Sequence, residues 1–158
     1  MEQEIYKDGK LVLVSCIIVT KNNELLLLYR TEHNHFETAG GRMQLSDLKD
    51  KNKITMDDLK KAAVREGKEE LGDVEFSPLK HFVSVEFKIP DGRNAVAHKF
   101  LTAIKKGTPK IMEPERFSKI ELVPIKTMKK YPLSPDLKLL VPNFNDYLKS
   151  IETNKNTS

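Results

Sequence analysis

The octapeptide 65–72 constrains the fold of this chain most, because it places three glutamates at spacings of three and four residues. Side chains at these spacings share one face of an α-helix. On a helical wheel that face also carries the apolar side chains of the preceding turns, whereas the neighbouring lysines point away. The glutamates are Glu66, Glu69 and Glu70, and the apolar residues are Leu59, Ala62 and Ala63. We therefore predict a helix over 57–71 whose buried stripe ends in carboxylates.

Three carboxylates on one helix face repel one another, by a few tenths of a kcal/mol for each pair at an open surface. The repulsion grows where less water surrounds the charges. A cation should therefore lie beside them, and Mg²⁺ or Mn²⁺ is the natural candidate because both prefer oxygen ligands. The alternative is a solvated triplet paired with Arg65 or Lys68, and the inward phase of the glutamates argues against it.

The octapeptide, Arg-Glu-Gly-Lys-Glu-Glu-Leu-Gly, resembles the second half of the Nudix box of MutT-type pyrophosphohydrolases, Arg-Glu-apolar-X-Glu-Glu-X-Gly. The segment 36–42 is similar to the family's aromatic-X-X-Pro-Gly-Gly strand end. The segment 112–117 is similar to an acidic loop of the branch that cleans the nucleotide pool. The resemblance implies an α/β Nudix fold, a mixed β-sheet sandwiched between α-helices, in one domain over 1–151. The polar tail 152–158 should fray.

The resemblance also implies roles for the residues of the motif. Glu66, Glu69 and Glu70 would ligate the metal, and Arg65 would orient a glutamate through a charge-assisted hydrogen bond. Such a metal would bridge phosphate oxygens, neutralise developing charge and acidify a water molecule.

The general base is left open by the sequence. Glu66 or Glu69 could take the proton, as in much of the family. A loop acid could do so instead, and we choose Glu115 because its spacing to the following strand fits the family's loop glutamate. Glu113 is its competitor.

Four residues are candidates for substrate binding. Gly40 and Gly41 leave a strand where bare backbone could approach metal and phosphates, although a plain turn would also use glycine. Phe36 would either pack or stack on a base. Asp136 lies in the loop that helps grip the base in the nucleotide-cleaning branch, and stabilisation of a helix N-terminus explains it equally well.

The sequence departs from the family pattern between the glycines and the octapeptide. The family places five residues between the box glycine and its first glutamate, but a Lys/Asp-rich insertion, about 44–54, follows Gly41 here. Counting back eight residues from Arg65 puts that first acid on Asp57. Gly67 fills the apolar slot of the motif, at a cost of up to ~1 kcal/mol in a helix interior. None of these changes removes a predicted metal ligand.

Composition indicates a globular protein, with 158 residues, 39% hydrophobic and 32% charged. The acidic start and the lack of a long apolar run predict a cytoplasmic protein without a membrane segment. A net charge of +4 from scattered lysines predicts no nucleic-acid polymer as partner. Cys16 lies in an apolar run and should be a buried strand residue. A homodimer is left open.

The pattern predicts a strand over 11–19 and a second over 24–30, paired as a hairpin. A further hairpin should join 82–87 to 95–104, and 119–125 should form another strand. Thr55 or Asp57 can cap the long helix, and Gly72 can end it. The last predicted helix begins at Ser134-Pro135-Asp136, is interrupted by Pro142 and resumes over 143–151.

These features favour a Mg²⁺-dependent pyrophosphohydrolase acting on a small nucleotide-type substrate. A nucleoside triphosphate, cleaved to monophosphate and pyrophosphate, is the leading candidate. ADP-ribose or a nucleotide sugar is the alternative, because family members that use ADP-ribose often carry a proline beyond the box, near the place of Pro90. A Nudix module that senses a nucleotide without catalysis is the third reading.

Overall fold

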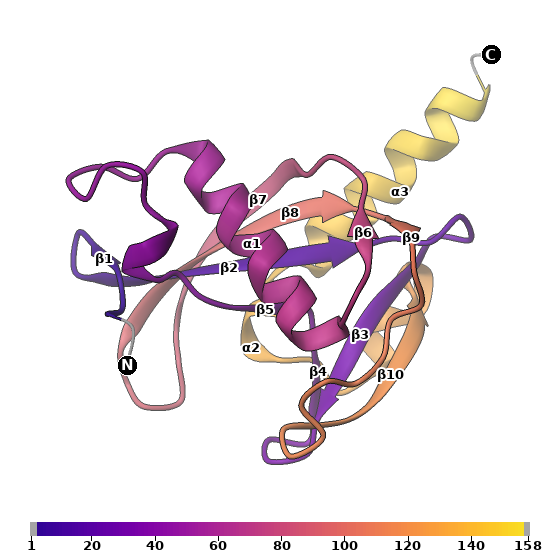
Figure 1. The fold of residues 1–158 in the computed structure, drawn as a ribbon. Helices are drawn as coiled ribbons and strands as arrows, with labels where there is room; N and C mark the ends of the chain where they lie inside the picture. The colour runs from indigo at the N-terminus through magenta and orange to yellow at the C-terminus, as the bar shows by residue number, and fades with distance from the viewer. Residues whose placement is uncertain (1–2, 157–158) are drawn as a thin grey trace.

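The computed structural model describes residues 3–156, with side chains up to Thr153. Two sheets and a short strand pair are covered by helices (Figure 1). The strands are β1 (Tyr6–Lys7), β2 (Lys10–Ile18), β3 (Glu24–Arg30), β4 (His35–Glu37), β5 (Ala39–Arg42), β6 (Glu75–Phe76), β7 (Lys80–Lys88), β8 (Asn94–Thr102), β9 (Ile104–Lys106) and β10 (Phe117–Pro124). Within the described residues, the helices are α1 (Met56–Leu71), α2 (Pro135–Leu139) and α3 (Val141–Asn156), with 3₁₀ turns at Leu45–Asp47 and Ile125–Lys130.

The larger sheet is mixed, in the order β1-β2-β8-β7, and β5 also pairs with β2. Strands β2 and β8 run parallel, whereas β5 runs antiparallel to β2 and β7 runs antiparallel to β8. The smaller sheet is antiparallel, in the order β10-β3-β4. The predicted α/β class with a mixed sheet is therefore confirmed.

The predicted hairpin between the first two long strands is wrong, although both strands exist. Strand β3 lies in the smaller sheet, and only an isolated bridge, Val19 to Leu25, joins it to the end of β2. The chain changes sheets through a turn in which Asn23 adopts a positive φ of 57°. Both edges of β2 are already taken by β8 on one side and by β1 and β5 on the other. The predicted hairpin of β7 and β8 is correct.

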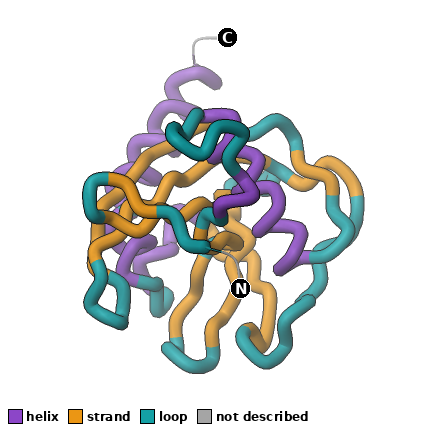
Figure 2. Tube along the Cα trace, turned by 60° about the vertical axis from the view of Figure 1, so that its left-hand side comes forward, coloured by secondary structure: helices purple, strands orange, loops and turns teal. Residues whose placement is uncertain are grey.

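Helices cover both sides of the larger sheet, so that two apolar cores form (Figures 1 and 2). Val12, Val14 and Cys16 of β2 pack in the core that contains α1. Ile17, from the opposite face of the same strand, packs with Phe144 of α3. Burial on both faces explains why β2 is apolar from Leu11 to Ile18 at every position except Ser15, because each fully buried side chain of this size contributes about 1.5–3 kcal/mol.

The C-terminal helices begin where the sequence predicts but end differently. Ser134 is the N-cap of α2, with Pro135 in its first turn. The predicted interruption exists, but it falls at Leu140, and Pro142 lies in the first turn of α3, where its missing N–H leaves no hydrogen bond unmade. The helix continues to Asn156, whereas we expected fraying from residue 152. Residues 157–158 of that tail lie outside the described residues.

Within residues 3–156, none of the helices combines the length and the apolar character that crossing a membrane requires.

Candidate functional site

Helix α1 carries the predicted glutamates, and its ends are set by its own sequence. The Thr55 hydroxyl accepts a hydrogen bond from Asp58 N at 3.1 Å, and the Asp58 carboxylate accepts one from Thr55 N at 3.2 Å. This reciprocal cap holds the first turn. Gly72 ends the helix with a φ of 88°, a conformation that favours glycine. The two ends together set the length of the helix that carries the glutamates.

Two of the three glutamates of α1 face inward. Glu70 is 1% exposed and Glu66 is 9% exposed, and both continue the buried stripe of Ala62 and Ala63. The Glu69 side chain is 53% exposed. The structure therefore brings Glu66 and Glu70 together and leaves Glu69 at the rim.

Strand β5 meets the inward glutamates with bare backbone. Gly40 N donates a hydrogen bond of 2.6 Å to Glu70 Oε1. A Cβ atom on Gly41 would overlap the Glu66 carboxylate, and one on Gly40 would overlap the backbone and Cβ of β2 at Val14 and Ser15. Gly40 is thus required for the close approach of β5 to β2, whereas a side chain at position 41 would displace the Glu66 carboxylate.

Burial raises the pKa of the Glu70 carboxyl group. Its removal from water raises the pKa of the carboxyl to about 8, which the hydrogen bond from Gly40 only partly offsets. Burial also raises the pKa of Glu66, although the Arg65 guanidinium opposes this. Among the described residues, Glu70 Oε2 has no hydrogen-bond partner. A buried carboxylate oxygen without a partner is costly, so a proton or a cation should occupy this place.

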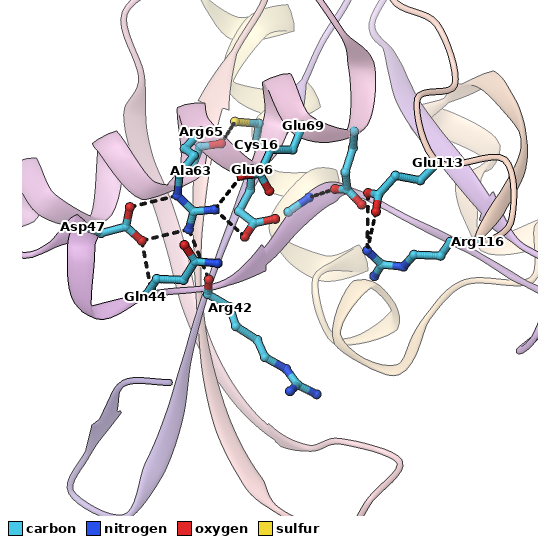
Figure 3. A network of polar contacts seen from close by, with 12 residues as sticks. Cys16, Arg42, Gln44, Asp47, Ala63, Arg65, Glu66, Glu69, Glu113 and Arg116 are labelled. Carbon is cyan, nitrogen blue, oxygen red and sulfur yellow. Dashed lines mark hydrogen bonds and ion pairs between the residues drawn. The ribbon is translucent and has the colours of Figure 1, made fainter. Parts of the chain in front are cut away.

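A clamp around Arg65 positions the glutamates (Figure 3). Its Nε and Nη2 donate to the two carboxylate oxygens of Asp47 at 2.9 and 2.8 Å, a bidentate geometry. Its Nη1 donates to Glu66 at 2.9 Å and to Glu69 at 3.1 Å. The hydrogen bonds to Asp47 raise the pKa of Arg65, so the guanidinium stays charged.

Asp47 is the residue that sequence reasoning missed. It is buried in the 3₁₀ turn of the insertion, where its carboxylate also accepts a hydrogen bond from Gln44 N at 2.8 Å. Five residues separate Gly41 from Asp47, which is the spacing of the family pattern. Counting forward from Gly41 would therefore have found Asp47. Asp57, found by counting backward, is exposed in the first turn of α1. The extra residues thus follow the first acid and do not precede it.

The acidic loop before β10 is tied to the end of α1. Lys110 N donates to Leu71 O at 3.0 Å, and Met112 N donates to Glu70 O at 3.2 Å. These bonds bring Glu113 close enough to Glu70 for its charge to raise the Glu70 pKa. Arg116 Nη1 lies 3.3 Å from Glu113 Oε2 (Figure 3). Glu115, the general base that we predicted, is instead exposed, and it does not line the cleft that Glu66 and Glu113 line.

The carboxylates present fit a hard divalent cation whose remaining coordination positions are filled by water and substrate. Among the described residues, no three acidic, histidine or cysteine side chains converge as a preformed metal cage. Arg65 donates to one oxygen of Glu66 and to one oxygen of Glu69, and Arg116 contacts Glu113. Glu66 and Glu70 are the two buried carboxylates, and Glu70 supplies an oxygen without a partner among the described residues. Mg²⁺ characteristically binds through one or two carboxylates and completes its shell with water and substrate phosphates.

A cleft of about 690 Å³ runs past these residues, a volume suited to a small molecule. Gly40, Gly41, Glu66 and Glu69 line one part of it, together with Glu113. The rest is lined by the floor of the larger sheet, the start of α2 and the turn between β7 and β8. Residues of this second part include Ser15, Thr38, Phe87, Pro90, Lys99 and Asp136.

Of the other predicted binding residues, one lines the cleft and one does not. Asp136 lines the cleft, as the prediction requires, but its carboxylate is already paired with Lys99 at 2.5 Å. Phe36 is 3% exposed and does not line the cleft. Its ring packs edge-on against Tyr29 and Tyr131. Of the two roles considered for Phe36, the geometry matches packing.

Comparison with known proteins identifies what this architecture is similar to. A family model described as NUDIX domain matches residues 9–144. No curated protein sequence matches the chain. The solved structures that match include a MutT NUDIX hydrolase from Burkholderia pseudomallei, with 20% identity, a TM-score of 0.67, and coverage of 84% of this chain and 95% of that one.

Two further solved structures carry a ligand or substrate name in their descriptions. A C. elegans Ap4A hydrolase, in a binary complex, has 15% identity and a TM-score of 0.64, with 88% of this chain and 98% of that chain covered. The NUDIX domain of Shewanella oneidensis NrtR, complexed with ADP ribose, has 17% identity and a TM-score of 0.64, with 90% of each chain covered. At these identities the likeness concerns the fold.

The raised pKa of Glu70 predicts how stability depends on pH. Between pH 4.5 and about 8 the folded protein keeps a proton on Glu70 that the unfolded chain has lost. The free energy of unfolding should therefore fall as pH rises through this window, by an amount on the order of a few kcal/mol in the absence of divalent metal. Glu70→Gln removes this titration. Urea denaturation with a chelator should show a steeper fall for the wild type than for the variant, and parallel curves would contradict the assignment.

The Arg65 clamp predicts unequal roles for two aspartates. Asp47→Asn weakens a buried bidentate pair and should lower the free energy of unfolding by roughly 1–3 kcal/mol. Asp57→Asn, the matched control, changes an exposed acid and should stay within about 0.5 kcal/mol. Urea denaturation at pH 7 measures both. Equal effects of the two substitutions would show that Asp47 does not hold Arg65.

Proposed function

Because this chain belongs to the Nudix family of hydrolases, we propose that it is a Mg²⁺- or Mn²⁺-dependent pyrophosphohydrolase. Its substrate would be a nucleoside triphosphate or a related nucleoside diphosphate derivative. The observation that carries the proposal is the buried carboxylate oxygen of Glu70, without a partner among the described residues and beside a second buried glutamate, Glu66. Glu66 lines a cleft large enough for a nucleotide, and Glu70 lies buried behind that lining.

In this proposal Glu66 and Glu70 hold the metal, and Glu69 can join them by leaving Arg65. The bound ion would supply Lewis-acid chemistry, neutralising phosphate charge and acidifying a water molecule. Glu70 must lose its proton for this, so its pKa of about 8 makes metal binding release a proton near neutral pH. Water would attack a phosphorus of the diphosphate link and break the bond to the bridging oxygen.

The residues around the acids orient these ligands and the phosphates. Arg65, anchored by Asp47, keeps the Glu66 carboxylate in one orientation. Gly40 N fixes Glu70 Oε1, which leaves Oε2 for the metal. Arg30 and Arg116 line the cleft, and both place their guanidinium over the Phe117 ring, at 4.9 and 5.3 Å from its centroid. Arg30 is paired with Glu37 and Arg116 with Glu113, so either guanidinium would bind a phosphate in exchange for its glutamate.

We assign the general base to Glu113 in place of Glu115. Glu113 lines the cleft beside Glu70, whereas Glu115 is exposed outside it. The Arg116 partner of Glu113 lies at the surface, and the 3.3 Å contact is loose enough to exchange for a water molecule. Glu66 and Glu69 are the competing bases, but metal binding by these carboxylates would lower their basicity.

ADP-ribose is the second candidate substrate, and one observation favours it. Pro90, at the turn between β7 and β8, lines the cleft. It lies close to, but displaced from, the place where ADP-ribose-using family members often carry a proline. The fold is also similar to that of the NrtR domain complexed with ADP ribose. That similarity equally accommodates a domain that binds a nucleotide without cleaving it.

A hydrolysis screen with Mg²⁺ tests the proposal. The substrates should include nucleoside triphosphates, damaged nucleotides, nucleotide sugars, dinucleoside polyphosphates and ADP-ribose. Inorganic pyrophosphate among the products identifies triphosphate cleavage, whereas AMP with ribose phosphate identifies ADP-ribose cleavage. Glu70→Gln should abolish turnover and the stabilisation by Mg²⁺ in thermal melts while leaving the fold intact. Binding without turnover anywhere in the panel would overturn the hydrolase in favour of a sensor.

Alanine variants of the two loop acids, Glu113 and Glu115, form a matched pair that tests which residue is the general base. Glu113→Ala should lower kcat by roughly 10²–10⁴-fold, the usual contribution of a positioned base, with a smaller effect on metal affinity. Glu115→Ala, two residues away, should leave kcat unchanged. Steady-state rates with the best substrate of the screen decide between them. A full rate in Glu113→Ala would return the base to α1.

A further inference from the structure

A network of four charged side chains joins the segment before β1 to two parts of the cleft. Glu4 Oε1 accepts a hydrogen bond from Arg93 Nη1 at 2.9 Å, and Glu4 Oε2 accepts one from Arg42 Nη1. Arg93 also donates to Asp91 Oδ2, through Nε at 2.9 Å and through Nη2 at 2.6 Å. A further hydrogen bond of 2.6 Å runs from Arg93 Nη1 to the Tyr6 hydroxyl. Two arginines thus share one glutamate, which lies between them.

The two arginines belong to different walls of the cleft. Arg42 is the last residue of β5, lines the cleft and follows Gly41, whose backbone approaches the acids of α1. Its side chain extends away from the Arg65 clamp (Figure 3). Arg93 ends the turn between β7 and β8, and residues 87–91 before it line the second part of the cleft. Glu4 therefore bridges the glycine strand and the turn.

The backbone on both sides of Glu4 is fixed to the body of the domain. Gln3 O accepts a hydrogen bond from Leu45 N at 3.1 Å, and Ile5 O accepts one from Val12 N at 2.9 Å. The Ile5 side chain is buried in the core beneath α1. The Glu4 carboxylate is therefore presented to both arginines from a fixed point.

The turn between β7 and β8, residues 89–93, depends on such a fixed point. Its backbone hydrogen bonds are local: Gly92 N donates to Ile89 O at 2.9 Å, and Ile89 N donates to Arg93 O at 3.0 Å. Its tip is exposed, and a segment held by local, solvent-exposed hydrogen bonds opens easily. The Arg93 side chain connects the turn to the N-terminal segment through Glu4 and Tyr6.

Stability of the fold is a poor explanation for the network. The side chains of Glu4, Arg42 and Arg93 are all partly exposed, and ion pairs in contact with water contribute little to the free energy of unfolding. The geometric effect is larger, because the network restricts a turn that forms part of the cleft. A ligand binds more weakly when its binding must first order a wall of the site.

We propose that Glu4 is a positioning residue for the proposed hydrolysis. By holding Arg93 it keeps the β7–β8 turn in place as a preformed wall of the cleft. By holding Arg42 it ties that wall to β5, whose glycines approach the acids of α1. The inference rests on the proposed function, because the position of the wall affects turnover only through a substrate bound in the cleft.

Steady-state kinetics of Glu4→Gln test the positioning role. This change removes the charge that holds both arginines and keeps the size of the side chain. With the best substrate of the screen, KM should rise by roughly two- to tenfold, the effect of ordering about one side chain on binding. The value of kcat should stay within about twofold, because the turn lies away from the acids that would hold the metal. Wild-type values of both constants, or a fall in kcat at constant KM, would overturn the inference.

The matched control is Glu86→Gln. It makes the same chemical change on β7 and breaks an exposed ion pair, Lys10 to Glu86 at 3.1 Å, that does not line the cleft. Both variants change the net charge by the same amount, so a general electrostatic effect on an anionic substrate would be equal in the two. KM of Glu86→Gln should equal that of the wild type. An equal rise of KM in both variants would overturn the role of the Glu4 network.

Amide hydrogen exchange tests the network without any substrate. The N–H groups of Ile89 and Gly92 form the hydrogen bonds that close the turn. They should exchange faster in Glu4→Gln than in the wild type, because the turn has lost its tie to the N-terminal segment. The N–H of Phe100, in the buried part of β8, should exchange at the same rate in both proteins. Unchanged exchange at Ile89 and Gly92 would overturn the inference whatever the kinetics show.

These measurements separate the positioning role from the hydrolysis itself. If the wild-type protein turns over no compound of the screen, the hydrolase is refuted, and calorimetry with ATP and with ADP-ribose in the presence of Mg²⁺ decides about Glu4. Weaker binding by Glu4→Gln than by Glu86→Gln would then support the positioning role, whereas equal or absent binding would overturn it. Turnover by the wild type with an unchanged KM in Glu4→Gln would support the hydrolase and overturn the positioning role.

Discussion

The hydrogen bond from Gly40 N to Glu70 holds the site together, because it joins the glycine strand to the helix that carries the acids. It uses one oxygen of Glu70 and leaves the other buried without a partner among the described residues. The close contact excludes water and thereby makes Glu70 a weak acid. Glycine at position 40 serves a second contact as well, because a Cβ atom there would overlap β2 at Val14 and Ser15.

Sequence patterns correctly predicted the features that depend on residues close together in the chain. The phase of α1, its Thr55 cap and its Gly72 end follow from residues within a few turns of one another, and they place Glu66 and Glu70 inward. Glu69 lies at the edge of the same stripe, where its side chain is exposed and accepts a hydrogen bond from Arg65. A helical wheel marks that boundary but cannot show which neighbour a boundary residue will contact.

Pairings between distant residues were the part that could not be predicted. Asp47 reaches Arg65 across 18 positions, and Lys99 reaches Asp136 across 37. Strand β2 pairs in parallel with β8, which is far along the chain, and not with β3. Such contacts depend on how the sheets assemble, which no local period encodes. For Asp47 a signal existed in the forward count from Gly41, and the insertion obscured it when the count ran backward.

The two-sided burial of β2 has a consequence for how the molecule comes apart. Val12, Val14, Cys16 and Ile18 belong to the core beneath α1, whereas Ile17 belongs to the core beneath α3. Loosening either helical layer therefore exposes apolar side chains of the shared strand. Neither layer can melt by itself, so the domain should denature in one cooperative, two-state step.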